Sequence, residues 1–252
     1  MSANSFKLGR LPGNIPVGLK DLTYYAAGPL PRPPASVNIP VVPTQSDGTP
    51  WGMLGNSDYG DCGVAGLEHG FMATAADTAE QESFPTADQA VSYYLTYDND
   101  QDNGVVLSQY LAYVKQKGFY GHTVSAYAPV ATQDLPTLLF AINSYDFAYA
   151  GISVSQGMMT KVEETAPPWN WTTSDVMSGS VVGGHCIALT AYDSTYLYGV
   201  TWGQPIAISY PAWAFMADEC WAVISGELST KGADGHGINL AALQADLSRL
   251  SS

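Results

Sequence analysis

The segment from Gly55 to Gly66 constrains the fold most, because it places a cysteine at the start of a predicted helix. It contains Asn56 six residues before Cys62, in the run Gly-Asn-Ser-Asp-Tyr-Gly-Asp-Cys-Gly-Val-Ala-Gly. Far downstream, His185 stands in a predicted strand with the sequence Gly-Gly-His-Cys-Ile-Ala-Leu. A cysteine, a histidine and an amide are the parts of a thiol nucleophile site. We therefore expect the fold to bring this helix and this strand together.

The chemistry of such a site explains why each residue type is needed. A free cysteine is only partly ionised near neutral pH, and a helix N-terminus together with an imidazolium lowers its pKa. Cys62 is the predicted nucleophile, and His185 is the predicted base that takes and returns the proton. Asn56 is expected to donate its side-chain N–H to the oxyanion, beside the backbone N–H of Cys62.

A histidine base also needs a group that orients its ring, and strand pairing locates candidates for it. If Asp193 to Thr195 turns a hairpin, residues 201 to 204 lie beside His185 in the neighbouring strand. Thr201 and Gln204 are the polar residues there, and both remain candidates.

These motifs, in this order, resemble those of the papain-like cysteine peptidases, which continue from the cysteine helix and the histidine strand to an Asn-Ser-Trp-Gly motif. The resemblance covers roughly residues 51 to 225, and it is closest to divergent members encoded by bacteria and their phages. It implies that Asn56 takes the place of the oxyanion glutamine, Cys62 that of the nucleophile and His185 that of the base. Trp202 and Gly203 match the Trp-Gly of the last motif.

Besides the shorter amide of Asn56 in place of glutamine, the chain departs from the papain pattern at two further places. The orienting asparagine falls at Val200 or Thr201, so that its role either passes to Thr201 or is vacant. Gly63 follows the nucleophile where papains carry tryptophan. The fold that the resemblance implies is α+β and two-lobed, with a helical lobe and a twisted antiparallel β lobe.

The predicted organisation has three parts. Residues 1–50 are expected to form an extended, proline-rich arm, because eight prolines between positions 12 and 43 exclude regular helix. Residues 51–225 form the papain-like domain, divided into a helical lobe (51–127) and a β lobe (134–225). Residues 226–252 form a C-terminal tail with a short amphipathic helix, in which Leu240, Leu243, Leu247 and Leu250 share one face.

Periodicity of the apolar residues predicts individual elements within this organisation. Helices are expected over residues 61–76, 86–97, 105–117, 134–145 and 211–219. Strands are expected over residues 147–154, 185–192, 196–202, 206–209 and 220–224.

Composition excludes several classes of protein. Nine basic against 23 acidic residues give a net charge of −14, which repels phosphate backbones, so nucleic acid is not an expected partner. We expect no membrane span and see no export signal, which favours a cytoplasmic or virion-associated protein. The three cysteines are expected to be free thiols. The spacing of cysteines and histidines fits no metal site, and no cofactor is expected.

Three functions from different classes follow. The first is a papain-like cysteine peptidase or a related acyl-transfer hydrolase that acts on a peptide or protein. The second is a papain-fold structural or binding protein of a phage particle or cell surface, and the third is a peptidoglycan-cleaving endopeptidase. The arm is predicted to be a wrapping segment, a propeptide or an assembly arm. Through it or the C-terminal helix, the chain is predicted to bind further copies of itself or virion and capsid proteins.

Overall fold

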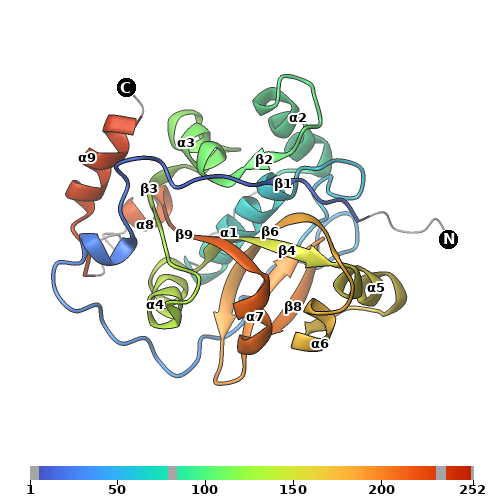
Figure 1. Ribbon diagram of the computed structural model, residues 1–252. Coiled ribbons are helices and arrows are strands. Elements are labelled where there is room, and N and C mark those ends of the chain that lie inside the picture. The colour runs from blue at the N-terminus through green and yellow to red at the C-terminus, as the bar shows by residue number, and fades with distance from the viewer. Residues whose placement is uncertain (1–5, 79–83, 231–236, 251–252) are drawn as a thin grey trace.

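The protein is a mixed α and β structure built on one large sheet (Figure 1). The computed structural model describes residues 6–78, 84–230 and 237–250. Seven strands form the sheet in the order β3-β9-β4-β6-β7-β8-β5. They are β3 (Val124–Pro129), β4 (Ala148–Ser155), β5 (Trp169–Trp171), β6 (Val181–Tyr192), β7 (Tyr196–Thr201), β8 (Gln204–Ser209) and β9 (Ala217–Ser225). Neighbouring strands are antiparallel, except that β5 runs parallel to β8.

The hairpin between β6 and β7 has the predicted register. Ala188 pairs with Val200 and Leu189 pairs with Gly199, so the end of β7 lies beside His185. The following turn contains only Trp202 and Gly203, because Thr201 already pairs with Gln204. Both turn residues have positive φ, 45° and 69°, as a two-residue hairpin turn requires.

The helices cover the sheet and pack beside it. They are α1 (Cys62–Thr78), α2 (Ala87–Tyr97), α3 (Leu107–Lys117), α4 (Leu135–Tyr145), α5 (Gln156–Glu164), α6 (Thr173–Val176), α7 (Tyr210–Met216), α8 (Gly226–Thr230) and α9 (Leu240–Leu250). Several begin and end where local chemistry predicts. Thr86 caps α2 through a capping box with Gln89, Asp134 caps α4, and Gly118 ends α3 with a φ of 74°.

Some element boundaries differ from the sequence prediction. The helix expected over residues 211–219 ends at Met216, because the chain from Ala217 onward pairs with β4 as strand β9. The helix expected from Val105 begins at Leu107, since Val105 and Val106 form strand β2. Strands β3 and β5 and helix α5 were not predicted. Strand β3 begins within the span assigned to the helical lobe, yet it pairs with β9.

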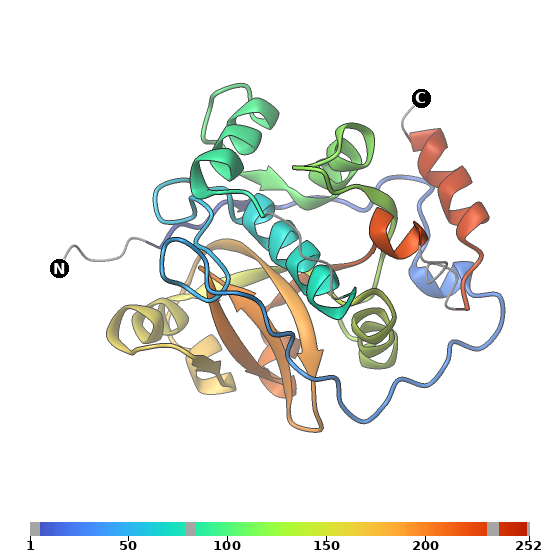
Figure 2. The ribbon, with the colours of Figure 1, turned by 180° about the vertical axis from the view of Figure 1, so that it is seen from behind.

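Helix α1 runs through the middle of the molecule, between the helices α2 and α3 and the sheet (Figure 2). Two of its glycines explain how closely it approaches its neighbours. A Cβ atom on Gly70 would lie 2.3 Å from the Phe147 ring, and one on Gly66 would lie 2.9 Å from Cys186 Sγ. The carboxylate of Asp61, the expected N-cap, does not cap this helix, although the Asp61 carbonyl accepts from Val64 and Ala65.

The N-terminal residues follow the surface in a largely extended path (Figures 1 and 2). Strand β1 (Arg10–Leu11) pairs in parallel with β2 (Val105–Val106), and a single 3-10 helix covers Leu22–Tyr25. Isolated bridges join Ala26 to Ile238 and Val37 to Tyr192. Residues 1–5 of the predicted arm lie outside the described residues, and the division into arm, lobes and tail stays a prediction.

Helix α9 packs on its own chain. Its Leu243 and Leu247 are buried, and Asp246 accepts a hydrogen bond from the Tyr25 hydroxyl at 2.9 Å. Gln244 donates to Ser125 in β3. Within the described ranges, no helix combines the length and the hydropathy that crossing a membrane requires.

Candidate active site

Cys62 is the first residue of α1, and its thiol lies against the histidine strand. The backbone of Cys186, the residue after His185, contacts the thiol closely enough to lower its pKa, as does the backbone of Gly9. The helix that carries Cys62 packs extensively on β6. The fold therefore packs the cysteine helix against the histidine strand.

The surroundings of the Cys62 thiol favour its neutral form. Burial, with a smaller contribution from the nearby Asp61 carboxyl, raises its pKa to about 12, against the opposing effects of the two backbone groups and of Arg10. The residue is only 1% exposed. Burial therefore favours the neutral thiol over the thiolate that the sequence leads us to expect.

His185 lies in β6 and is held by two contacts. The Thr201 hydroxyl lies 2.6 Å from Nε2, and the Trp202 indole stacks on the imidazole with ring centroids 4.2 Å apart. Nδ1 is buried and makes no hydrogen bond. Burial lowers the pKa of His185 to about 3, with a further contribution from His69. The ring is therefore neutral and fixed in orientation, and its Nδ1 is available for a further hydrogen bond.

Replacing Thr201 with valine is expected to destabilise the fold by about 1–3 kcal/mol, because it leaves the buried Nε2 of His185 without a partner. Urea denaturation measures this change. Thr201→Ser keeps the hydroxyl and serves as the matched control. Equal stability of the valine and serine variants would show that the contact does not contribute to the fold.

Asn56, the predicted oxyanion donor, is buried beside the start of α1. Its Nδ2 donates to the Tyr59 carbonyl at 3.0 Å, and its side chain lowers the pKa of Asp61, which burial raises well above the usual value. Gln204, the other candidate for orienting His185, lies beyond the turn at the start of β8. Of the two candidates, Thr201 is the one whose side chain contacts the imidazole.

Residues 6–10 lie directly across this site. Lys7 N–H donates to the Asn56 carbonyl at 3.0 Å, and Val105 N–H donates to the Gly9 carbonyl at 2.7 Å. The Trp202 indole N–H donates to the Lys7 carbonyl at 3.0 Å, while the Phe6 ring packs on Trp202 with centroids 5.2 Å apart. An extended piece of the chain's own backbone therefore covers the thiol and packs on Trp202, whose indole stacks on the imidazole.

Gly9 fits this position only because it has no side chain. A Cβ atom on Gly9 would lie 1.8 Å from the Gly60 carbonyl oxygen, and one on Gly104 would lie 2.2 Å from the Gly9 oxygen. Both neighbours are backbone atoms and cannot rotate away. The segment consequently packs against the backbone at Gly60 and Gly104 with no room for a side chain at position 9.

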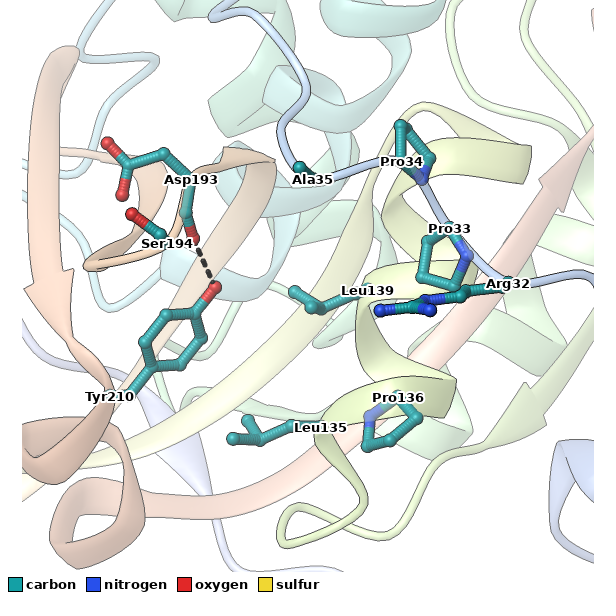
Figure 3. Close-up of a pocket in the computed structure, with 10 residues that line it drawn as sticks. All are labelled: Arg32, Pro33, Pro34, Ala35, Leu135, Pro136, Leu139, Asp193, Ser194 and Tyr210. Carbon is teal, nitrogen blue, oxygen red and sulfur yellow. Dashed lines mark hydrogen bonds between the residues drawn. The ribbon is translucent and has the colours of Figure 1, made fainter.

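A separate pocket of about 590 Å³ lies away from these residues (Figure 3). Arg32 to Ala35 line one side of it, the start of α4 another, and Tyr210 and the hairpin at Asp193 the third. The Tyr210 hydroxyl donates to the Asp193 carbonyl at 2.7 Å. Cys62, His185, Asn56 and Thr201 are not among its lining residues, so this pocket is not the predicted thiol site.

The described part of the chain shows neither a cluster of metal ligands nor a disulfide bond. Within it, no group of three or more histidine, cysteine, aspartate or glutamate residues is placed to hold a metal ion. Cys62, Cys186 and Cys220 are all free and buried.

Comparison with solved structures identifies the fold as that of the papain-like cysteine proteases, as the sequence predicts. Xylellain, a cysteine protease from Xylella fastidiosa, superposes with a TM-score of 0.59 at 11% identity, over 89% of this chain and 98% of that one. The cysteine protease and lectin-like domains of Cwp84, a surface layer associated protein of Clostridium difficile, superpose with a TM-score of 0.50 at 10% identity. That match covers 88% of this chain and 56% of the other. No family model and no curated protein matches the sequence.

Sequence reasoning missed the residues that cover the site. Gly9 and Arg10 contact it only through long-range packing, and nothing in their local sequence distinguishes them from the rest of a proline-rich segment. The stacking of Trp202 on His185 was also not predicted. The Trp-Gly pair in a two-residue turn next to the histidine strand is the signal that could have located it.

Proposed function

We propose that this protein is a papain-like cysteine peptidase, or a related acyl-transfer hydrolase, whose thiol is covered by residues 6–10 of its own chain. The observation that carries the proposal is the extended backbone at Gly9, which lies against Cys62 where a peptide substrate would lie. The test is to displace this segment and to measure hydrolysis of a mixed library of quenched fluorescent peptides.

The proposal gives each residue a role in acyl transfer. With Nε2 of His185 donating to Thr201, Nδ1 keeps a lone pair that accepts the Cys62 proton. The sulfur attacks the substrate carbonyl carbon, and the proton passes from His185 to the departing amine as the C–N bond breaks. Water then attacks the thioester, releases the acid and returns the proton to Cys62. Thr201 and Trp202 hold the ring in place throughout.

The covered state predicts a latent enzyme. Because both groups are fully desolvated, the pair is a neutral thiol and a neutral imidazole. Removal of residues 6–10 from the site would admit water, which lowers the pKa of the thiol and raises that of the imidazole. The same segment that occupies the position of the substrate thus also suppresses ionisation of the nucleophile.

Asn56→Ala is expected to lower peptide hydrolysis by roughly 10²-fold in the uncovered enzyme, because one donor to the oxyanion is lost. Steady-state kcat/KM for a library-selected peptide measures the effect. Asn56→Gln restores an amide and is expected to recover part of the rate. If both variants hydrolysed the peptide at the rate of the uncovered enzyme with Asn56 intact, Asn56 would have no role in the mechanism.

One observation favours the alternative of a binding or structural protein. The Asn56 amide donates to the Tyr59 carbonyl, so this donor is already engaged in the covered state. A protein that binds a peptide across Cys62 without cleaving it would show the same contact. Peptide binding without turnover, after the covering segment has been displaced, would favour this alternative.

A further inference from the structure

Arg10 places its side chain in an acidic pocket beside the thiol. Its Nη1 lies 2.7 Å from Asp218 Oδ2, and its Nε lies 3.2 Å from Glu219 Oε1. The Arg10 side chain is only 7% exposed. The guanidinium thus engages two carboxylates through two different nitrogens, which is the fork geometry that arginine provides and lysine lacks.

The rest of the protein holds both carboxylates without help from Arg10. The Ser153 hydroxyl donates to Asp218 Oδ2 at 2.8 Å, and the Trp221 indole N–H donates to Glu219 Oε2 at 2.9 Å. Ser153 lies in β4, whereas the two acidic residues and Trp221 lie in β9. The acceptors are therefore oriented by hydrogen bonds within the sheet, in addition to those from Arg10.

Two glycines make room for the arginine. A Cβ atom on Gly151 would lie 2.7 Å from both Cδ and Nε of Arg10, and one on Gly184 would lie 2.5 Å from the Arg10 carbonyl oxygen. Gly184 is the residue before His185. The sheet thus provides both the pocket for the arginine side chain and the space for its backbone, next to His185, the predicted base.

The pocket is also close to the nucleophile. Arg10 directly follows Gly9, whose backbone lies against Cys62, and the guanidinium charge lowers the pKa of the thiol. Any extended peptide that replaces residues 6–10 would direct a side chain near its scissile bond into the same pocket. An empty pocket would leave two neighbouring carboxylates without a cation, which favours a positively charged occupant.

We propose that the pocket formed by Gly151, Asp218 and Glu219 is a specificity subsite that selects an arginine side chain of the peptide substrate, and that Arg10 occupies it in the covered state. This inference rests on the proposed function, because it names the substrate class of that site. The net charge of −14 favours the approach of basic peptides to the protein.

The test uses the full chain with Gly9→Val, in which the added side chain forces residues 8–10 off the site. The added change Cys62→Ala prevents turnover, so that binding is measured alone. The probe is a fluorescent hexapeptide with the sequence of residues 6–11, Phe-Lys-Leu-Gly-Arg-Leu. Its partner probe carries citrulline, a neutral analogue of the same shape, in place of the arginine. Fluorescence polarisation gives the two dissociation constants.

The arginine peptide is expected to bind at least ~10-fold more tightly than the citrulline peptide, because the pocket supplies two charge-assisted hydrogen bonds. The double change Asp218→Asn and Glu219→Gln is expected to remove this difference. Asp88→Asn, an exposed carboxylate in the first turn of α2, controls for the general loss of negative charge and should leave the preference intact.

Equal affinity for the two peptides, in a variant that retains the near-ultraviolet circular dichroism of the parent, would overturn the inference. If no peptide bound to Gly9→Val, Arg10→Ala would provide a second background that empties the pocket, and equal affinities there would also overturn it. A preference for arginine without turnover in the Cys62-containing enzyme would support the subsite and contradict the hydrolase. Turnover without a preference for arginine would support the hydrolase and contradict the subsite.

Discussion

Replacing Gly9 with valine in the full chain is expected to raise the rate of Cys62 alkylation by iodoacetamide at least ~100-fold at pH 7.5, because a thiol must ionise to react. The valine Cβ would lie 1.8 Å from the Gly60 carbonyl oxygen, so the segment must leave the site. Mass spectrometry of tryptic peptides measures alkylation at each cysteine separately.

The pH dependence of this reaction has a definite sign. In the parent chain the pKa of Cys62 is about 12, so its alkylation rate should keep rising with pH beyond pH 10. In Gly9→Val the thiol is hydrated and its pKa falls, so the rate should reach its plateau at a lower pH. The difference between the two chains is therefore largest near neutral pH and decreases as pH rises towards 12.

Gly28→Val is the matched control, because a Cβ atom at Gly28 meets no other atom within 4 Å. Its Cys62 should react as slowly as that of the parent. If Gly9→Val remained as unreactive as the parent while its circular dichroism showed a folded protein, residues 6–10 would not control access to the thiol.

Adding Cys62→Ala to Gly9→Val is expected to lower peptide hydrolysis by about 10⁴-fold or more, because covalent catalysis has no other nucleophile in this site. The measurement is the initial rate on the quenched peptide library. The fold should persist, since alanine fits the space of the cysteine and the surrounding contacts belong to α1 and β6.

Cys220→Ala provides the control for this experiment. Cys220 is also buried and free, but it lies in β9 and pairs with Ala150. Its loss should change the hydrolysis rate by less than about 2-fold, because it takes no part in the transfer. Undiminished hydrolysis by the Cys62→Ala chain would exclude the cysteine mechanism, and the binding or structural alternative would take its place.

Much of the fold could be predicted because its signals are local. Thr86 and Gln89 form a capping box from side chains three residues apart, and Gly118 ends a helix because glycine adopts positive φ without strain. The β6–β7 pairing could be obtained by counting, since a hairpin fixes the register of everything that follows its turn. That counting placed residues 201 to 204 beside His185, with Thr201 and Gln204 both as candidates, and the structure shows Thr201 in contact at 2.6 Å.

Boundaries that depend on pairing with distant strands could not be predicted in this way. Residues 217–219 continue a helical pattern in sequence, yet they join β9 because β4 offers a partner. Val105 and Val106 likewise pair with Arg10 and Leu11 instead of beginning α3. In both places, backbone hydrogen bonds to a strand far away in sequence outweigh a local preference for helix.

The sequence by itself determined the residue types of the candidate site, their order and the α+β class, because these follow from motif spacing and from hydrophobic periodicity. Only the tertiary structure decided the state of that site. It placed Gly9 over Cys62 and Arg10 between Asp218 and Glu219, contacts that join residues far apart in the chain. Desolvation by this covering segment opposes the helix N-terminus and keeps the thiol neutral, and the burial that causes it is a property of packing which no local pattern of residues encodes.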